Sequence, residues 1–142
     1  MDSKKFLVGG IIGGITNFLL GWLVWGILLM NFMRSHSNPT AAVIFRSETD
    51  IAWGALIIGN FSLGFMITYI LIKANIKSAA TGAATGFIIA LLTSLGLDCI
   101  MYAQMKIYGT TAMAVDVLAA AVVTAIVAAV VGWFLGRGEK TS

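Results

Sequence analysis

The sequence predicts an all-α integral membrane protein, a four-helix transmembrane bundle built from two tandem helical hairpins. Charged residues make up only 11% of its 142 residues and hydrophobic residues 59%, with a mean hydropathy of +0.96, whereas a soluble domain carries about 25% charged residues. The apolar runs between the charged clusters are long enough to cross a hydrocarbon core about 30 Å thick. Because a backbone in lipid must satisfy its own hydrogen bonds, and the alternation of barrel strands is absent, these runs are expected to be helices.

We expect a single transmembrane domain over residues 1–142, with spans at about 6–30, 51–72, 78–103 and 112–135. The only long connection between the spans is an outer loop at 31–50. The end of this loop, residues 47–50, has the Ser-Glu-Thr-Asp pattern that is typical of a helix N-terminus. It is therefore predicted to cap the second span.

The distribution of lysine and arginine predicts which side of the membrane each helix end faces. Three basic residues, Arg34, Arg46 and Lys106, fall on the side of the outer loop. The other basic residues fall on the opposite side, together with both termini: Lys4, Lys5, Lys73, Lys77, Arg137 and Lys140. Since cytoplasmic loops carry the excess of positive charge, both termini are expected in the cytoplasm and the chain in the cell membrane.

Glycines spaced four residues apart occur in the first, third and fourth predicted spans, where they let two helix backbones approach closely. They are Gly9, Gly10, Gly13, Gly14, Gly82, Gly86, Gly132 and Gly136. The pairs at 10/14 and 82/86 occupy similar places in the two halves of the chain and suggest two similar hairpins. These stripes are expected either to pack helices within one chain or to join copies into a homo-oligomer.

Polar side chains near the expected midplane form a layer across the four spans. Its members are Asn17, Asn60, Thr93, Ser94 and Thr124. Asn17 and Asn60 lie at comparable depth in one hairpin, so they could pair. Because interhelical hydrogen bonds of this kind average only about 0.6 kcal/mol, the layer predicts either structural register or a path for a polar solute or ion.

Four carboxylates near the outer face form a candidate ion or proton site: Asp98, Asp116, Glu48 and Asp50. Asp50 and Asp116 are expected in the first turns of their helices, where the macrodipole favours negative charge. That explanation does not apply to Asp98, which is predicted to lie inside the third span, about 10 Å from the midplane. A carboxylate there costs a few kcal/mol unless it is paired, protonated or hydrated. Asp98 is therefore predicted either to be paired structurally or to handle a proton or a cation.

A copper site is a further hypothesis, since Met101 and Met105 are one helical turn apart, Cys99 is close by, and sulfur ligands favour Cu(I). Methionine is also an ordinary apolar gap-filler. We expect no cofactor and no enzymatic activity, because the sequence has no nucleophile–base pair, phosphate loop, HExxH or CxxC. The net charge of +3, with no basic run interleaved with aromatics, argues against a nucleic-acid partner and leaves the lipid bilayer as the expected one.

Three segments together resemble the domain-of-unknown-function 1761 family: residues 17–26 (NFLLGWLVWG), residues 82–87 (GAATGF), and Val115-Asp116-Val117-Leu118 with the small-residue helix after it. The family consists of short bacterial four-helix membrane proteins. The resemblance therefore implies the same architecture over nearly the whole chain, a location in the cytoplasmic membrane of a bacterium, and no assigned activity. Small multidrug exporters are also short and four-helical, but they need a glutamate in the first span, and residues 6–30 contain no acidic residue.

These observations favour a structural or accessory membrane protein, self-associating through its glycine stripes. The alternative is a minimal transporter or channel that handles a proton or cation at Asp98 near the outer face. A third hypothesis is a copper-handling protein.

Overall fold

The computed structural model describes residues 2–137, which are helical apart from their connections and one isolated β-bridge. Lys140, one of the basic residues counted toward the cytoplasmic side, lies outside the described residues. The long helices are α1 (Ser3–Leu23), α3 (Trp53–Lys73), α4 (Ala79–Gln104) and α5 (Thr110–Gly136). Between α1 and α3 lie the π-helix η1 (Val24–Leu28), the helix α2 (Met30–Ser35) and the 3-10 helices η2 (Pro39–Val43) and η3 (Glu48–Asp50).

Four helical segments are long and apolar enough to cross a membrane: α1 with η1, α3, α4 and α5. They confirm the all-helical class and the four apolar helices predicted from the sequence. Their ends lie close to the expected boundaries. The helix α3 begins at Trp53 rather than at residue 51, and α5 begins at Thr110 rather than at residue 112.

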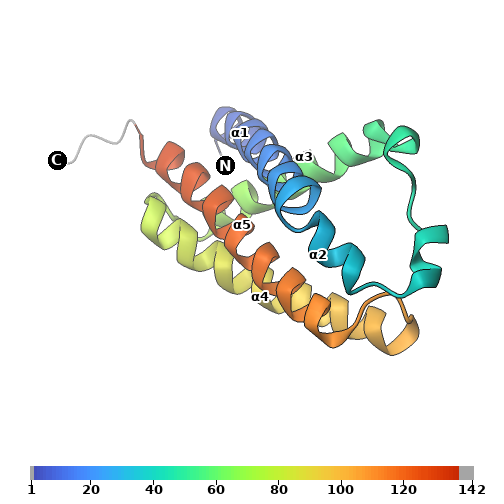
Figure 1. The fold of residues 1–142 in the computed structure, drawn as a ribbon. Helices are drawn as coiled ribbons and strands as arrows, with labels where there is room; N and C mark the ends of the chain where they lie inside the picture. The colour runs from blue at the N-terminus through green and yellow to red at the C-terminus, as the bar shows by residue number, and fades with distance from the viewer. Residues whose placement is uncertain (1, 138–142) are drawn as a thin grey trace.

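The helices pack as two close pairs, α1 with α3 and α4 with α5 (Figure 1). Glycines set these contacts, since a Cβ atom on Gly13 would lie 3.1 Å from Gly64 Cα, and one on Gly86 would lie 2.7 Å from the Thr124 carbonyl oxygen. The remaining predicted glycines also face atoms of a neighbouring segment of the same chain: Gly9, Gly10, Gly14, Gly82, Gly132 and Gly136. All eight therefore serve packing within the chain in this structure.

The two pairs join through a hydrophobic core near the chain termini. Ile67 and Leu71 of α3 pack there against Ala128, Val131 and Leu135 of α5, and all five are at most 3% exposed. The start of α1 and the end of α5 lie at this same end of the molecule, which we call the terminus end (Figure 1).

At the opposite end, the loop end, α3 diverges from α4 and α5 (Figure 1). No other side chain packs against Gly54, Gly59 or Gly96 there, because a Cβ atom on any of them would have no atom within 4 Å outside its immediate surroundings. The chain after α1 crosses toward α5, where the Asn38 N–H donates to the Ile107 carbonyl at 2.8 Å, beside the Ser37–Tyr108 bridge. α1 therefore contacts α3, whereas the chain that follows α2 contacts the α4–α5 connection at the loop end.

Two details predicted for the helix starts are wrong. Ser47 precedes the short η3 helix, whereas α3 begins after Ala52 without a side-chain cap, so Asp50 lies outside α3. The first turn of α5 holds no acidic residue, because this helix begins at Thr110 directly after Gly109 and Asp116 falls in its second turn. The macrodipole therefore explains neither carboxylate in the way the sequence suggested.

Candidate functional site

Asp98 and Asp116 share a small pocket at the loop end, between the last turns of α4 and the first turns of α5. Its volume is about 180 Å³, and we call it the acid pocket. The two aspartates meet because α4 and α5 run antiparallel, so residues well past the middle of one helix lie beside early residues of the other. The pocket is lined by Asp98, Met101, Tyr102, Met105, Ile107, Tyr108, Met113 and Asp116.

Asp116 is held by a residue from the other helix pair. The Trp25 indole N–H donates a hydrogen bond of 2.6 Å to Asp116 Oδ1. Trp25 belongs to the π-helix η1, a rare geometry that often occurs at functional sites. Trp25 is therefore a side chain that connects the segment after α1 to α5.

Asp98 has a buried oxygen with no partner. Among the described residues, Asp98 Oδ2 is the buried side-chain oxygen or nitrogen that lacks a hydrogen bond. Asp116 lines the same pocket as this carboxyl group. Two carboxylates can hydrogen-bond to each other only if one of them carries a proton, so the orphaned oxygen marks a place where a proton or cation would be stabilised.

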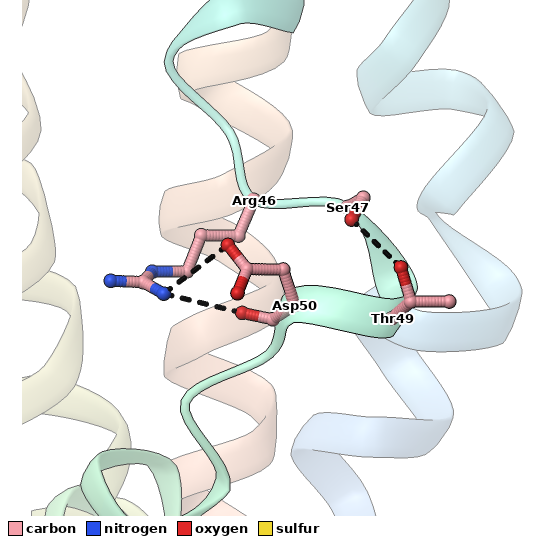
Figure 2. Close-up of polar contacts among 4 residues, drawn as sticks. All are labelled: Arg46, Ser47, Thr49 and Asp50. Carbon is pink, nitrogen blue, oxygen red and sulfur yellow. Dashed lines mark hydrogen bonds and ion pairs between the residues drawn. The ribbon is translucent and has the colours of Figure 1, made fainter.

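No basic side chain lines the acid pocket in the described part of the chain. Arg34 instead pairs with Glu48 at 3.0 Å, and Arg46 pairs with Asp50 at 3.3 Å. Figure 2 shows one Arg46 guanidinium nitrogen donating to both the side-chain and the carbonyl oxygen of Asp50. Of the four carboxylates that the sequence grouped together, the structure brings together Asp98 and Asp116. Glu48 and Asp50 lie apart from them, in exposed ion pairs of the connecting loop.

The single histidine is also engaged elsewhere. The His36 ring stacks on Phe32 with centroids 4.2 Å apart, and its Nδ1 lies 2.9 Å from the Phe32 carbonyl oxygen. The ring is therefore held on its own helical turn rather than directed at the acid pocket. Among the described residues, neither a basic side chain nor the histidine therefore lines the pocket that holds the two aspartates.

Tyr108 reports on the electrostatics of this pocket from the α4–α5 connection. Burial raises the pKa of its phenol above the usual range, and the negative charges of Asp116 and then Asp98 raise it further. The Tyr108 ring also contacts Phe45, with centroids 5.8 Å apart. Tyr108 therefore connects the acid pocket to the outer loop.

Only some of the sulfur-containing side chains proposed as copper ligands line the acid pocket. Met101 and Met105 line the acid pocket together with Met113, which the sequence did not single out. Cys99 is exposed and is not part of the lining. No group of three or more histidine, cysteine, aspartate or glutamate residues with metal-binding geometry occurs among the described residues.

A second, larger cavity lies between the two helix pairs, and we call it the vestibule. Its volume is about 870 Å³. The whole predicted polar layer faces it: Asn17, Asn60, Thr93, Ser94 and Thr124 all belong to its lining. Asn17 Nδ2 donates to Asn60 Oδ1 at 2.8 Å, and Asn60 Nδ2 donates to the Leu56 carbonyl oxygen at 2.7 Å. The layer is thus the polar part of a cavity wall.

Trp25 separates the vestibule from the acid pocket. It lines the vestibule and binds Asp116 through its indole nitrogen. The sequence did not identify Trp25 or Tyr108 as site residues, since neither carries a charge and both fit the usual placement of interfacial aromatics. The only feature of the sequence that could have pointed to Trp25 is its spacing from Trp22, one turn away in a helix without acidic residues.

Comparisons with family models, with curated proteins and with solved structures return no match for this chain. The resemblance to the domain-of-unknown-function 1761 family stays a prediction. The functional inference therefore depends on the geometry of the two cavities.

Proposed function

We propose that this chain is a multi-pass protein of the cell membrane that takes up and releases a proton at the Asp98–Asp116 pair. The observation that carries the proposal is the acid pocket, where two carboxylates from different helices line one small cavity and no basic residue belongs to its described lining. The bundle is taken to be inserted as two tandem hairpins, α1–α3 and α4–α5. The excess of basic residues at the terminus end supports cytoplasmic termini and an acid pocket near the outer face.

Charge repulsion gives the pair its chemistry. Two carboxylates in one small pocket repel each other when both are ionised, so the second negative charge is disfavoured. A single proton between the carboxyl groups removes this repulsion and supplies the donor that Asp98 Oδ2 lacks. Because the oxygens belong to two helices, gain or loss of that proton alters the force between α4 and α5.

Trp25 distinguishes the two carboxyl groups. Its indole N–H stabilises negative charge on Asp116, so Asp98 is the group that carries the exchangeable proton. Ionisable residues within membrane spans commonly belong to ion pathways or proton relays. Asp98, with one orphaned oxygen and an acidic neighbour, has the properties such a role requires.

Proton flux in proteoliposomes tests the proposal. The purified chain is reconstituted with a pH-sensitive dye inside the vesicles, and a potassium diffusion potential provides the driving force. We expect a flux above that of empty vesicles, reduced at least about tenfold in Asp98→Asn, because an amide cannot release a proton at this position. An unchanged rate in Asp98→Asn would overturn the proposal.

Glu48→Gln is the matched control, since it removes one carboxylate from the exposed ion pair with Arg34 and leaves the acid pocket intact. It should keep the wild-type flux. The structural or accessory role that the sequence favours predicts no flux in any of these proteins. Helix content and elution volume, measured on the same samples, show that a variant without flux is still folded.

A further inference from the structure

We propose that the vestibule is a binding site for an uncharged, mostly apolar small molecule that carries a hydrogen-bonding group. The cavity of about 870 Å³ lies in the size range of small-molecule sites, which are commonly apolar with a few fixed polar groups. This inference does not require the proton chemistry of the acid pocket. It rests on the residues that line the cavity and on the absence of charged side chains among the described lining residues.

The lining favours an uncharged ring-containing ligand. No charged side chain lines the vestibule within the described residues, so an ion that entered it would lose its hydration without compensation. Three of the four tryptophans of the chain, Trp22, Trp25 and Trp53, lie in the wall, with Phe18 and Phe45. Flat aromatic faces supply large apolar contact areas and suit another ring.

The lining also offers polar groups that the chain itself does not use. Ser94 on α4 and Thr124 on α5 line the vestibule, and within the described residues neither hydroxyl group makes a hydrogen bond. By contrast, Thr93 donates to the Ile89 carbonyl oxygen at 2.8 Å, and the two asparagines bind each other. Free hydroxyl groups in an apolar wall can fix the orientation of a ligand with one or two polar atoms.

Other parts of the chain limit which kinds of molecule can occupy this cavity. Phe45, Ile51 and Trp53 from the outer loop and the start of α3 form part of the lining. The glycine stripes that would let another helix approach closely are occupied within the chain. A small lipophilic molecule therefore fits the vestibule better than a helix from a second copy.

Two related dyes test the chemistry of the site. N-phenyl-naphthylamine is an uncharged aromatic amine, and anilinonaphthalene sulfonate has the same ring system with a negative charge. Both are titrated into the detergent-solubilised full-length protein, with energy transfer from tryptophan as the signal. We expect saturable binding of the neutral dye and at least about tenfold weaker binding of the sulfonate, because the lining offers that charge no partner.

Substitutions that place a larger side chain in the vestibule test whether the neutral dye binds there. Gly21 lines the vestibule, and a Cβ atom there would meet only Asn60 Oδ1, at 3.9 Å. The leucine side chain in Gly21→Leu should therefore extend into the cavity and weaken binding of the neutral dye about tenfold or more. Gly59→Leu is its control, because Gly59 has open space around it and does not line the vestibule.

Ser94→Leu repeats the test from α4 and keeps it decisive if Gly21→Leu fails to fold. Gly96→Leu, an open position on the same helix outside the lining, is the matched control. Asp98→Asn should leave dye binding unchanged, so a failure of the proton proposal does not affect this one. Equal losses in filled and control variants, tight binding of the sulfonate, or a dimer that Gly21→Leu dissociates would overturn the inference.

Discussion

Asp116 accepts a hydrogen bond from Trp25, and this bond joins the two helix pairs at the end of the molecule where they diverge. Hydrogen bonds to charged groups contribute about 1.5–3 kcal/mol. Few other polar contacts join the pairs there, so the charge of Asp116 affects both the acid pocket and the position of η1. Under the proposed proton exchange, a carboxylate with this dual role would link the protonation of the pocket to the packing of the first helical segment.

Tyr108 allows the charge of the acid pocket to be measured. Asp116→Asn removes a negative charge that raises the pKa of the Tyr108 phenol, so this pKa should fall toward the usual value of about 10. The measurement is an ultraviolet titration of tyrosinate, with Tyr108→Phe subtracted to isolate this residue. Burial is the largest cause of the raised pKa and persists in the variant, so only part of the shift should be lost.

The raised pKa of Tyr108 also determines how the stability of the folded protein depends on pH. A raised pKa means that the folded protein holds the phenolic proton more tightly than the unfolded chain. This contribution is complete below the unfolded pKa and disappears as the pH rises through the folded pKa. Asp116→Asn should therefore make alkaline unfolding less dependent on Tyr108, and an unaltered Tyr108 titration would contradict the proximity of the two groups.

At the scale of elements, the same residue type has opposite uses along α3. Gly64 lies against the backbone of α1. An added Cβ atom there would come closer to Gly13 and Gly14 than van der Waals contact allows. Gly59, one and a half turns earlier, has no neighbour within 4 Å of that position. Close approach therefore requires glycine at Gly64, whereas Gly59 only carries the entropic cost of glycine in a helix.

Paired alanine substitutions should separate these uses. Gly64→Ala is expected to lower the free energy of unfolding by about 1–3 kcal/mol, because the obstructing atoms are backbone and cannot move aside. Gly59→Ala should be neutral or stabilise by up to about 1 kcal/mol, since alanine has the higher helix propensity. Thermal unfolding followed by circular dichroism in one detergent provides both values, and equal effects would contradict the packing of α1 on α3.

At the scale of the whole molecule, the bundle is tight at the terminus end and open at the loop end. Glycine contacts and fully buried aliphatic side chains hold the terminus end. Exposed ion pairs, ring contacts and a few hydrogen bonds hold the loop end. Because regions with few buried apolar contacts open at lower free energy, we expect the loop end, which holds the acid pocket, to open before the terminus end.

The sequence predicted the four apolar helices because long uncharged runs depend only on composition and length. It also grouped Asn17 with Asn60, since their depth follows from counting residues from the helix ends. It could not show that the polar layer faces a cavity, because that depends on how far the two helix pairs diverge. The predicted cap at 47–50 was wrong because those residues form a separate short turn, with Asp50 engaged by Arg46.

The proposed orientation is the property of the whole molecule on which the placement of both cavities depends, and cysteine labelling tests it. Cys99 is the only cysteine, so Cys99→Ala gives a background without thiols. Thr49→Cys in the outer loop should react with a membrane-impermeant maleimide in intact cells, whereas Ala74→Cys, exposed in the α3–α4 connection, should react only after permeabilisation. The reason is the excess of lysine and arginine at the terminus end, which is retained in the cytoplasm. Labelling of position 74 alone in intact cells would reverse the orientation and place the acid pocket at the cytoplasmic face. Labelling of both positions in intact cells would contradict a structure whose two ends lie on opposite sides of the membrane.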